Sequence, residues 1–137
     1  MDFDLSDEQK DLQRTARQFA EKEFAPFAAK WDEEKIFPTD TLKKAGELGF
    51  MGIYTPEDCG GLGLSRLAAS IIFEELAAGC TSTTAYITIH NMVTWMLATF
   101  AHAELKNEIV PKLAAGELLG SYCLTEAGAG SDAAALK

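Results

Sequence analysis

Apolar residues recur through most of this chain at the three- and four-residue spacing that is typical of amphipathic helices. The first such segment begins after Ser6, and Ser6 with Gln9 has the form of a capping box. Pro26 predicts that this helix bends or ends there and that another begins. The apolar positions of the segment are Leu12, Ala16, Phe19, Ala20, Phe24 and Phe27.

A shorter helix and a loop are expected next. The helix is predicted over residues 39–48, capped by Thr39 or Asp40, with Gly49 as the left-handed residue that ends it. Residues 52–63 hold so many glycines and prolines that we expect an irregular loop. Their glycines lack the spacing of a dinucleotide-binding fingerprint, which favours a purely structural loop.

The helix expected between Ser65 and Gly79 carries two adjacent carboxylates, Glu74 and Glu75. Neighbouring residues on a helix point about 100° apart, so this pair is not expected to act on one substrate as acid and base. We interpret one carboxylate as facing solvent and the other as lying at an edge between helices.

The segment 82–100 is predicted to be a helix that is apolar almost all round, and it contains no Asp, Glu, Lys or Arg. Such a helix is typical of burial in a larger assembly. Its polar side chains fall on one side, where they either bond to carbonyls of their own helix or line a ligand cavity. His90 lies off this side and is expected to be a partnered or surface side chain, because no second ligand stands at metal-binding spacing. The polar stripe consists of Thr84, Thr88, Asn91 and Thr99.

The pattern changes after a last predicted helix, 103–115, which Pro111 weakens. Residues 118–124 are apolar and favour a strand. A lone strand cannot satisfy its own backbone groups, so this one is expected to pair with a sheet outside the chain. The chain is therefore expected to be a piece of a longer polypeptide.

A turn of small residues follows the predicted strand, with Gly128 and Gly130 on either side of Ala129. Such a turn can present consecutive backbone N–H groups, unshielded by large side chains, to a phosphate or another anion.

Composition narrows the possible partners. A net charge of −9, with Lys and Arg scattered among acids, argues against nucleic acid or an anionic membrane as a partner. Three cysteines (Cys59, Cys80, Cys123) without C-x-x-C spacing indicate a reducing compartment, with neither a disulfide framework nor a metal site. The acidic start Met1–Asp4 and the short apolar runs lead us to expect a cytoplasmic protein of a bacterium, without a leader or a membrane span.

The stretch Tyr122-Cys123-Leu124-Thr125-Glu126-x-Gly128-x-Gly130-Ser131-Asp132 resembles the flavin-binding signature that opens the β-domain of the acyl-CoA dehydrogenases. The resemblance extends over essentially the whole chain, through Leu5–Gln9, Gly60–Ser65 and Pro111–Glu117. Within the family, residues 82–92 are especially similar to short branched-chain members, which act on isobutyryl-CoA. One departure is Ala127, where many members have proline.

The resemblance implies an all-α fold, an orthogonal bundle of about five to six helices over residues 1–117. The first strand of a truncated middle β-domain is implied for residues 118–137. In relatives, the matching segment lines FAD, with Thr125 near the pyrimidine edge of the isoalloxazine and Gly130–Ser131 near the pyrophosphate. The implied FAD contacts are Tyr122, Cys123, Leu124, Thr125, Gly128, Gly130 and Ser131.

The resemblance also implies substrate contacts. Ser131 matches a position that touches the CoA part of the substrate, while Thr84 and Thr88 match positions near the far end of the acyl pocket. This agreement shifts the interpretation of the polar stripe toward a cavity.

The implied reaction is the α,β-dehydrogenation of an acyl-CoA thioester, in which a carboxylate removes the α-proton while a hydride passes from the β-carbon to FAD. The catalytic glutamate of the family belongs to a C-terminal domain that this chain lacks. We therefore expect no catalytic residue here, and we expect the chain alone to be inactive and to bind FAD weakly. Such an enzyme would serve fatty acid and branched-chain amino acid catabolism.

The implied partners are an acyl-CoA substrate, an electron-transfer flavoprotein as electron acceptor, and further copies in a homodimer or homotetramer of the full-length chain. Two other classes stay open. An acyl-CoA oxidase or a flavin monooxygenase would use the same helical scaffold, and a non-enzymatic interaction module would need no cofactor.

Overall fold

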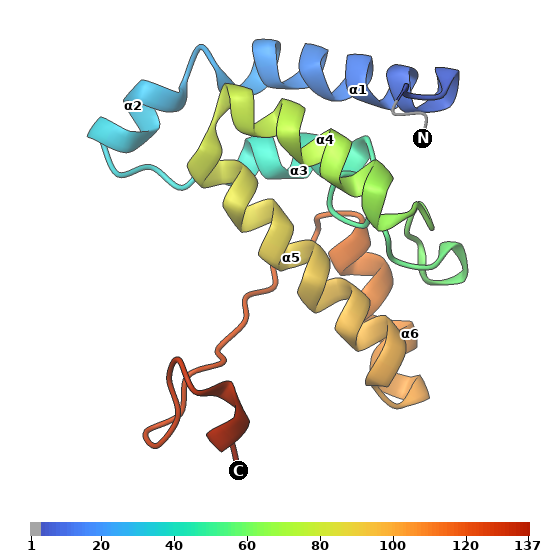
Figure 1. Ribbon diagram of the computed structural model, residues 1–137, viewed down its shortest axis with the longest axis vertical. Helices are drawn as coiled ribbons and strands as arrows, with labels where there is room; N and C mark the ends of the chain where they lie inside the picture. The colour runs from blue at the N-terminus through green and yellow to red at the C-terminus, as the bar shows by residue number, and fades with distance from the viewer. Residues whose placement is uncertain (1–3) are drawn as a thin grey trace.

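The computed structural model describes residues 4–137, which form a body of helices and a C-terminal segment that leaves it (Figure 1). The all-α prediction is confirmed. The α-helices are α1 (Asp7–Phe19), α2 (Ala28–Glu33), α3 (Thr39–Glu47), α4 (Arg66–Gly79), α5 (Thr81–Phe100) and α6 (Ala103–Ala114). Short turns of other helix types are the π-helix Ala20–Phe24 and the 3-10 turns Glu57–Cys59 and Ala133–Ala135.

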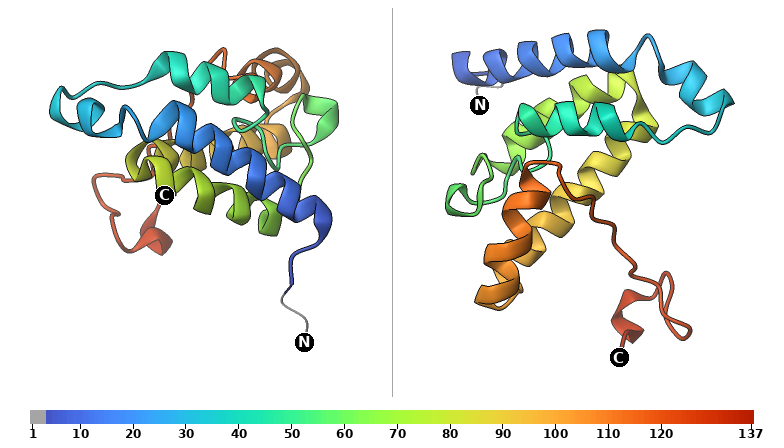
Figure 2. Two further views of the ribbon diagram at one scale, coloured as in Figure 1. Left: turned by 90° about the horizontal axis from the view of Figure 1, so that it is seen from above. Right: turned by 180° about the vertical axis from the view of Figure 1, so that it is seen from behind.

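Two groups of helices make the body. Helix α1 lies over α3 and α4, and α5 descends from the end of α4 with α6 running back beside it (Figures 1 and 2). The main core lies among α1, the π-helix, α3, α4 and the loop after α3, with Ile87 of α5 at its edge. Its largest fully buried side chains include Phe24, Leu42, Met51, Ile72, Leu76 and Ile87.

Local chemistry sets several helix ends as predicted. Ser6 and Gln9 form the predicted capping box, in which the Ser6 hydroxyl accepts from the Gln9 N–H at 3.2 Å and the Gln9 side chain accepts from the Ser6 N–H at 2.9 Å. Ser65 caps α4 in the same way by accepting from the Ala68 N–H at 3.1 Å. Gly49, with φ +79°, ends α3 in the left-handed conformation that glycine favours.

The predicted cap of α3 was wrong. The helix already includes Thr39, and its N-cap position is Pro38, which makes no side-chain capping bond. The Pro38 carbonyl accepts from the Leu42 N–H at 3.0 Å, so the helical bonding begins one residue earlier than a Thr39 cap requires.

The predicted strand over residues 118–124 is not formed in the structure. In the described part of the chain, the one isolated β-bridge joins Glu126 to Ala129. A strand exists through hydrogen bonds to a neighbouring strand, and residues 4–137 supply no neighbour for this segment.

No helix within the described residues is long and apolar enough to pass through a bilayer. Across the same residues, no group of His, Cys, Asp and Glu is arranged to hold a metal ion. All three cysteines are free thiols, with Cys59 buried and Cys123 exposed.

Candidate functional site

The small-residue turn near the C-terminus is closed by its own backbone. The Glu126 N–H donates to the Ala129 carbonyl at 3.0 Å, and the Ala129 N–H donates back to the Glu126 carbonyl at 3.2 Å. Ala129 is buried, whereas the predicted FAD-contacting residues are all exposed. These exposed residues are Tyr122, Cys123, Leu124, Thr125, Gly128, Gly130 and Ser131.

The two glycines of this turn stand in open space. A Cβ added at Gly128 or at Gly130 would meet nothing within 4 Å. Among residues 4–137, the N–H groups of Gly130 and Ser131 have no hydrogen-bond partner. The turn therefore offers free donors and room for a group outside this chain, which fits the phosphate-binding chemistry predicted for it.

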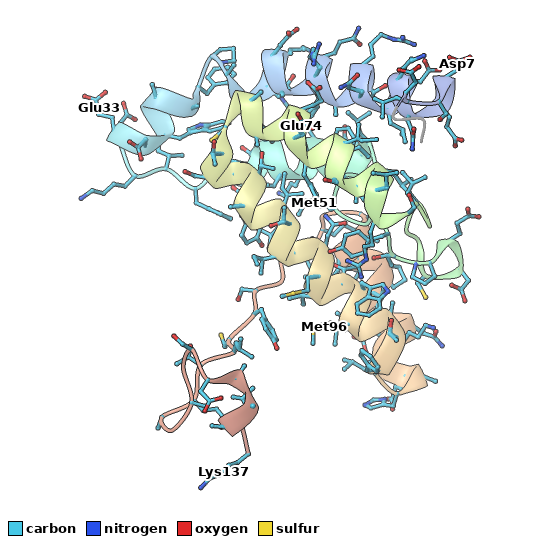
Figure 3. All side chains as sticks on the ribbon, in the orientation of Figure 1. Asp7, Glu33, Met51, Glu74, Met96 and Lys137 are labelled. Atoms are coloured by element: carbon cyan, nitrogen blue, oxygen red, sulfur yellow. The ribbon has the colours of Figure 1, made fainter. Side chains whose placement is uncertain are left out.

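The segment that carries this turn stands apart from the helices, out to Lys137 (Figure 3). Its apolar side chains are left open to solvent, with Tyr122 42% and Leu124 41% exposed. Exposed apolar side chains beside free N–H groups are suited to a flat, partly apolar ligand that also carries an anionic group.

Thr84 and Thr88, the predicted acyl-pocket residues, lie in the first half of α5. Both hydroxyls donate to carbonyls of their own helix, Thr84 to Cys80 at 2.9 Å and Thr88 to Ala85 at 2.7 Å. The two side chains also line an open groove between α4 and α5, together with Ser70, Phe73 and Ala77. The interpretation that these hydroxyls bond to their own helix is confirmed, and the ligand cavity stays a prediction, which a hydroxyl that can still accept a hydrogen bond leaves open.

The structure does not bring the threonine pair together with Ser131. The groove lies between the helices of the body, whereas the turn lies at the far end of the departing segment (Figure 1).

Asn91 departs from the stripe that the sequence suggested. Its side chain is fully buried, and its Oδ1 accepts from the Ile53 N–H at 2.7 Å. Its Nδ2 donates to the carbonyls of Phe50 at 2.8 Å and Ile87 at 3.0 Å. Asn91 therefore joins α5 to the loop after α3, and no ligand is needed to explain it. A single amide within an apolar helix was the one sequence signal for this role.

His90 is a partnered histidine, as predicted. It is fully buried, its Nε2 lies 3.0 Å from the Leu113 carbonyl, and its Nδ1 accepts from the Gly120 N–H at 3.0 Å. Burial lowers the pKa of the imidazole below its usual value. These bonds tie together α5, the end of α6 and the start of the C-terminal segment, a link that sequence reasoning missed.

The adjacent carboxylates of α4 divide as predicted. Glu75 is buried against α1, where the Arg17 guanidinium donates to it through two bonds of 2.7 and 2.6 Å. This hydrogen bonding lowers the pKa of the Glu75 carboxyl. Glu74 is exposed. A carboxylate paired in this way holds two helices together and is not available as a catalytic base.

A family model described as "Acyl-CoA dehydrogenase, N-terminal domain" matches residues 6–117, which is most of the chain. This chain belongs to the acyl-CoA dehydrogenase family. Its helical body coincides with the matched region, and the C-terminal segment follows directly after it.

Two relatives within the acyl-CoA dehydrogenase family are mitochondrial isobutyryl-CoA dehydrogenases. The protein from Bos taurus is 54% identical over 96% of this chain, and the protein from Dictyostelium discoideum is 50% identical over 96%. The aligned region is 32% of each relative, so the chain spans about a third of the length of these proteins.

Solved structures contain a region with the same fold. A glutaryl-coenzyme A dehydrogenase in complex with glutaryl-CoA matches 99% of this chain and 35% of its own, with a TM-score of 0.91 and 39% identity. The FAD complex of PigA matches 97% of this chain and 36% of its own, with a TM-score of 0.90 and 30% identity.

Proposed function

We propose that this chain is the N-terminal part of an FAD-dependent acyl-CoA dehydrogenase that oxidises a short or branched acyl-CoA thioester between its α- and β-carbons. The observation that carries the proposal is the exposed turn with free N–H groups at Gly130 and Ser131. The similarity to isobutyryl-CoA dehydrogenases over 96% of the chain supports the substrate class.

In this proposal, residues 1–117 are the helical domain and residues 118–137 begin a β-domain. FAD would supply the hydride acceptor. The Gly130 and Ser131 N–H groups would hold its pyrophosphate, and Thr125 would bond to the edge of the isoalloxazine. The remaining contacts would come from Tyr122, Cys123, Leu124 and Gly128.

The groove between α4 and α5 is proposed to hold the far end of the acyl group. Its walls combine Phe73 and Ala77 with the hydroxyls of Thr84 and Thr88. Such a lining accepts a short alkyl chain and leaves acceptor positions for a polar atom or a water. Ser131 is proposed to contact the CoA part, and the catalytic base is proposed to lie beyond this chain.

Further partners follow from the same proposal. They are an electron-transfer flavoprotein as the electron acceptor and further copies of the complete polypeptide in a homodimer or homotetramer. We also propose a cytoplasmic location, which the three free thiols support. The two isobutyryl-CoA dehydrogenases, by contrast, are mitochondrial.

The test compares the complete polypeptide with the 137-residue chain. We expect the complete polypeptide to bind FAD in a fluorescence titration and to reduce a dye when isobutyryl-CoA is added. We expect the 137-residue chain alone to show neither tight binding nor turnover.

Two results would contradict the proposal. A complete polypeptide that binds no FAD would point to the non-enzymatic interaction module. Peroxide released in step with substrate consumption would show an oxidase in place of a dehydrogenase.

A further inference from the structure

Side chains on one face of α5 form hydrogen bonds to Gly120, in the segment that follows α6. Tyr86 and His90 lie one helical turn apart, and both reach Gly120. The His90 Nδ1 accepts from the Gly120 N–H at 3.0 Å, and the Tyr86 hydroxyl donates to the Gly120 carbonyl at 3.3 Å. Both backbone polar groups of Gly120 are therefore bound by side chains of one helix.

The close approach of Gly120 to α5 leaves little room for a side chain. A Cβ added at Gly120 would lie 3.1 Å from Cγ1 of Val93, which is one turn beyond His90 on the same face of α5. A larger residue would therefore require Val93 or the Gly120 backbone to shift by a few tenths of an ångström.

The partners of His90 also fix its protonation. A carbonyl can only accept, so Nε2 must carry a hydrogen to bond to Leu113. A backbone N–H can only donate, so Nδ1 must be unprotonated to bond to Gly120. Both bonds form only with the neutral imidazole that is protonated at Nε2.

The surroundings of His90 are consistent with a neutral ring. The titratable group that faces it is Tyr86 of α5, with ring centroids 6.1 Å apart. The end of α6 and the following segment present the Leu113 carbonyl and the Gly120 N–H, which are backbone groups.

We propose that Tyr86 and His90 form a clamp on Gly120 that positions the flavin-contacting residues Thr125–Ser131. This inference rests on the proposed function, since it concerns how the same segment reaches FAD. Beyond Gly120 the segment makes no hydrogen bond to the helices in the described part of the chain, so the clamp is its last fixed point.

The geometry explains why a fixed point here affects the turn. The stretch from Gly120 to Thr125 spans at most about 17 Å when fully extended. A clamped Gly120 therefore limits how far the turn can lie from the body. If Gly120 is released, the last fixed residue is Leu118, whose N–H donates to the Lys112 carbonyl at 3.2 Å, and the turn can move further away. Confining a binding segment before the ligand arrives lowers the cost of ordering it, which strengthens binding. Tyr86 and His90 are thus positioning residues that act through Gly120.

Two substitutions of His90 separate its two bonds. His90→Asn places an amide near the position of Nδ1, so it keeps an acceptor for Gly120 and loses the donor to Leu113. His90→Gln reaches the position of Nε2, so it keeps the donor to Leu113 and loses the acceptor for Gly120. Tyr86→Phe removes one hydroxyl with little change in packing.

His102→Asn is the matched control. It makes the same His-to-Asn change at an exposed position, and Asn can replace the His102 side chain as the cap of α6.

The first readout is hydrogen exchange at the Gly120 amide in the complete polypeptide. We expect its rate to rise about tenfold in His90→Gln, since one partly buried hydrogen bond is lost. In His90→Asn and His102→Asn it should stay near the parent value.

The second readout is the dissociation constant of FAD for the same variants. It should rise about tenfold in His90→Gln, and by less in Tyr86→Phe, with His90→Asn close to the parent. Equal exchange and equal affinity in His90→Gln and His90→Asn would overturn the clamp. If Gly120 exchanges faster in His90→Gln than in His90→Asn but FAD affinity is unchanged, the positioning role would be overturned. A parent polypeptide that binds no FAD at all would instead overturn the proposed function, a distinct result.

Discussion

The helical body and the C-terminal segment satisfy their polar groups in opposite ways. In the body, buried side chains reach across to backbone of other elements, as Asn91 does with Phe50 and Ile53. In the segment, the bonds from Glu126 to Ala129 stay within one turn, while the Gly130 N–H stays free. The body is therefore held by contacts within this chain, whereas the segment leaves backbone donors without partners among the described residues.

The largest effect on stability is expected from removing the Asn91 amide. Asn91→Leu fills the site with an apolar side chain but leaves the Ile53 N–H and the Phe50 carbonyl buried without partners. We expect the free energy of unfolding to fall by about 3 kcal/mol, measured by urea denaturation. Thr99→Val, at an exposed site on the same helix, should change it by less than about 0.5 kcal/mol. An Asn91→Leu protein as stable as the parent would contradict this account of the body.

Gly46 in the helical body and Gly128 in the C-terminal segment differ in how much space surrounds them. A Cβ at Gly46 would overlap the carbonyl of Ala115, whereas a Cβ at Gly128 would meet nothing within 4 Å. We expect Gly46→Ala to lower the free energy of unfolding by about 1–3 kcal/mol, despite the better helix propensity of alanine. Gly128→Ala should leave thermal stability unchanged. Equal effects at the two glycines would mean that the segment packs as tightly as the body.

Acidification should weaken the body through His90. Burial lowers the pKa of His90 in the folded state, so below its unfolded pKa of about 6.5 the unfolded chain binds more protons. This contribution to stability is present above pH ~6.5 and is lost as the pH falls through the folded pKa. Thermal melts from pH 7 to 5 should show the loss in the parent and in His102→Asn, and a flatter profile in His90→Asn. If the melting temperature of the parent depends on pH as weakly as that of His90→Asn, the role of His90 in acid destabilisation would be contradicted.

Glu75 contributes to the pH dependence of stability at lower pH than His90 does. Its pKa is lowered by Arg17, so its contribution is present above its unfolded pKa of about 4.3 and is lost as the pH falls through the folded pKa.

The smallest effect is expected from removing the segment itself. Deleting residues 121–137 leaves the clamp on Gly120 intact, and we expect a change in the free energy of unfolding below about 0.5 kcal/mol. Circular dichroism melts of the two chains would measure it. A clear loss of stability would show that the segment contributes to the body after all.

Features set by neighbouring residues were predictable from the sequence. The capping box at Ser6 and the end of α3 at Gly49 depend on chemistry within a few residues, and both are confirmed. The predicted cap of α3 was wrong because the helix begins earlier, with Pro38 at its N-cap position. The strand over residues 118–124 is not formed, because a strand needs a second strand to pair with and the described residues supply none. The start of a β-domain at this point stays a prediction.

The long-range links could not be predicted in the same way. Asn91 bonds to residues about forty positions earlier, and His90 to one thirty positions later, with nothing in the intervening sequence to indicate either partner. The predicted FAD contacts came from the resemblance, and they stay predictions.

The position of Gly120 has a consequence for how the protein is made. Translation adds about 5–20 residues per second, so the helices can complete their bonds, the last of them at Gly120, while later residues are still being added. During that interval the apolar side chains of Tyr122 and Leu124 and the free thiol of Cys123 are exposed on the nascent chain. During synthesis the segment after Gly120 is therefore open to chaperones, oxidants and unwanted association.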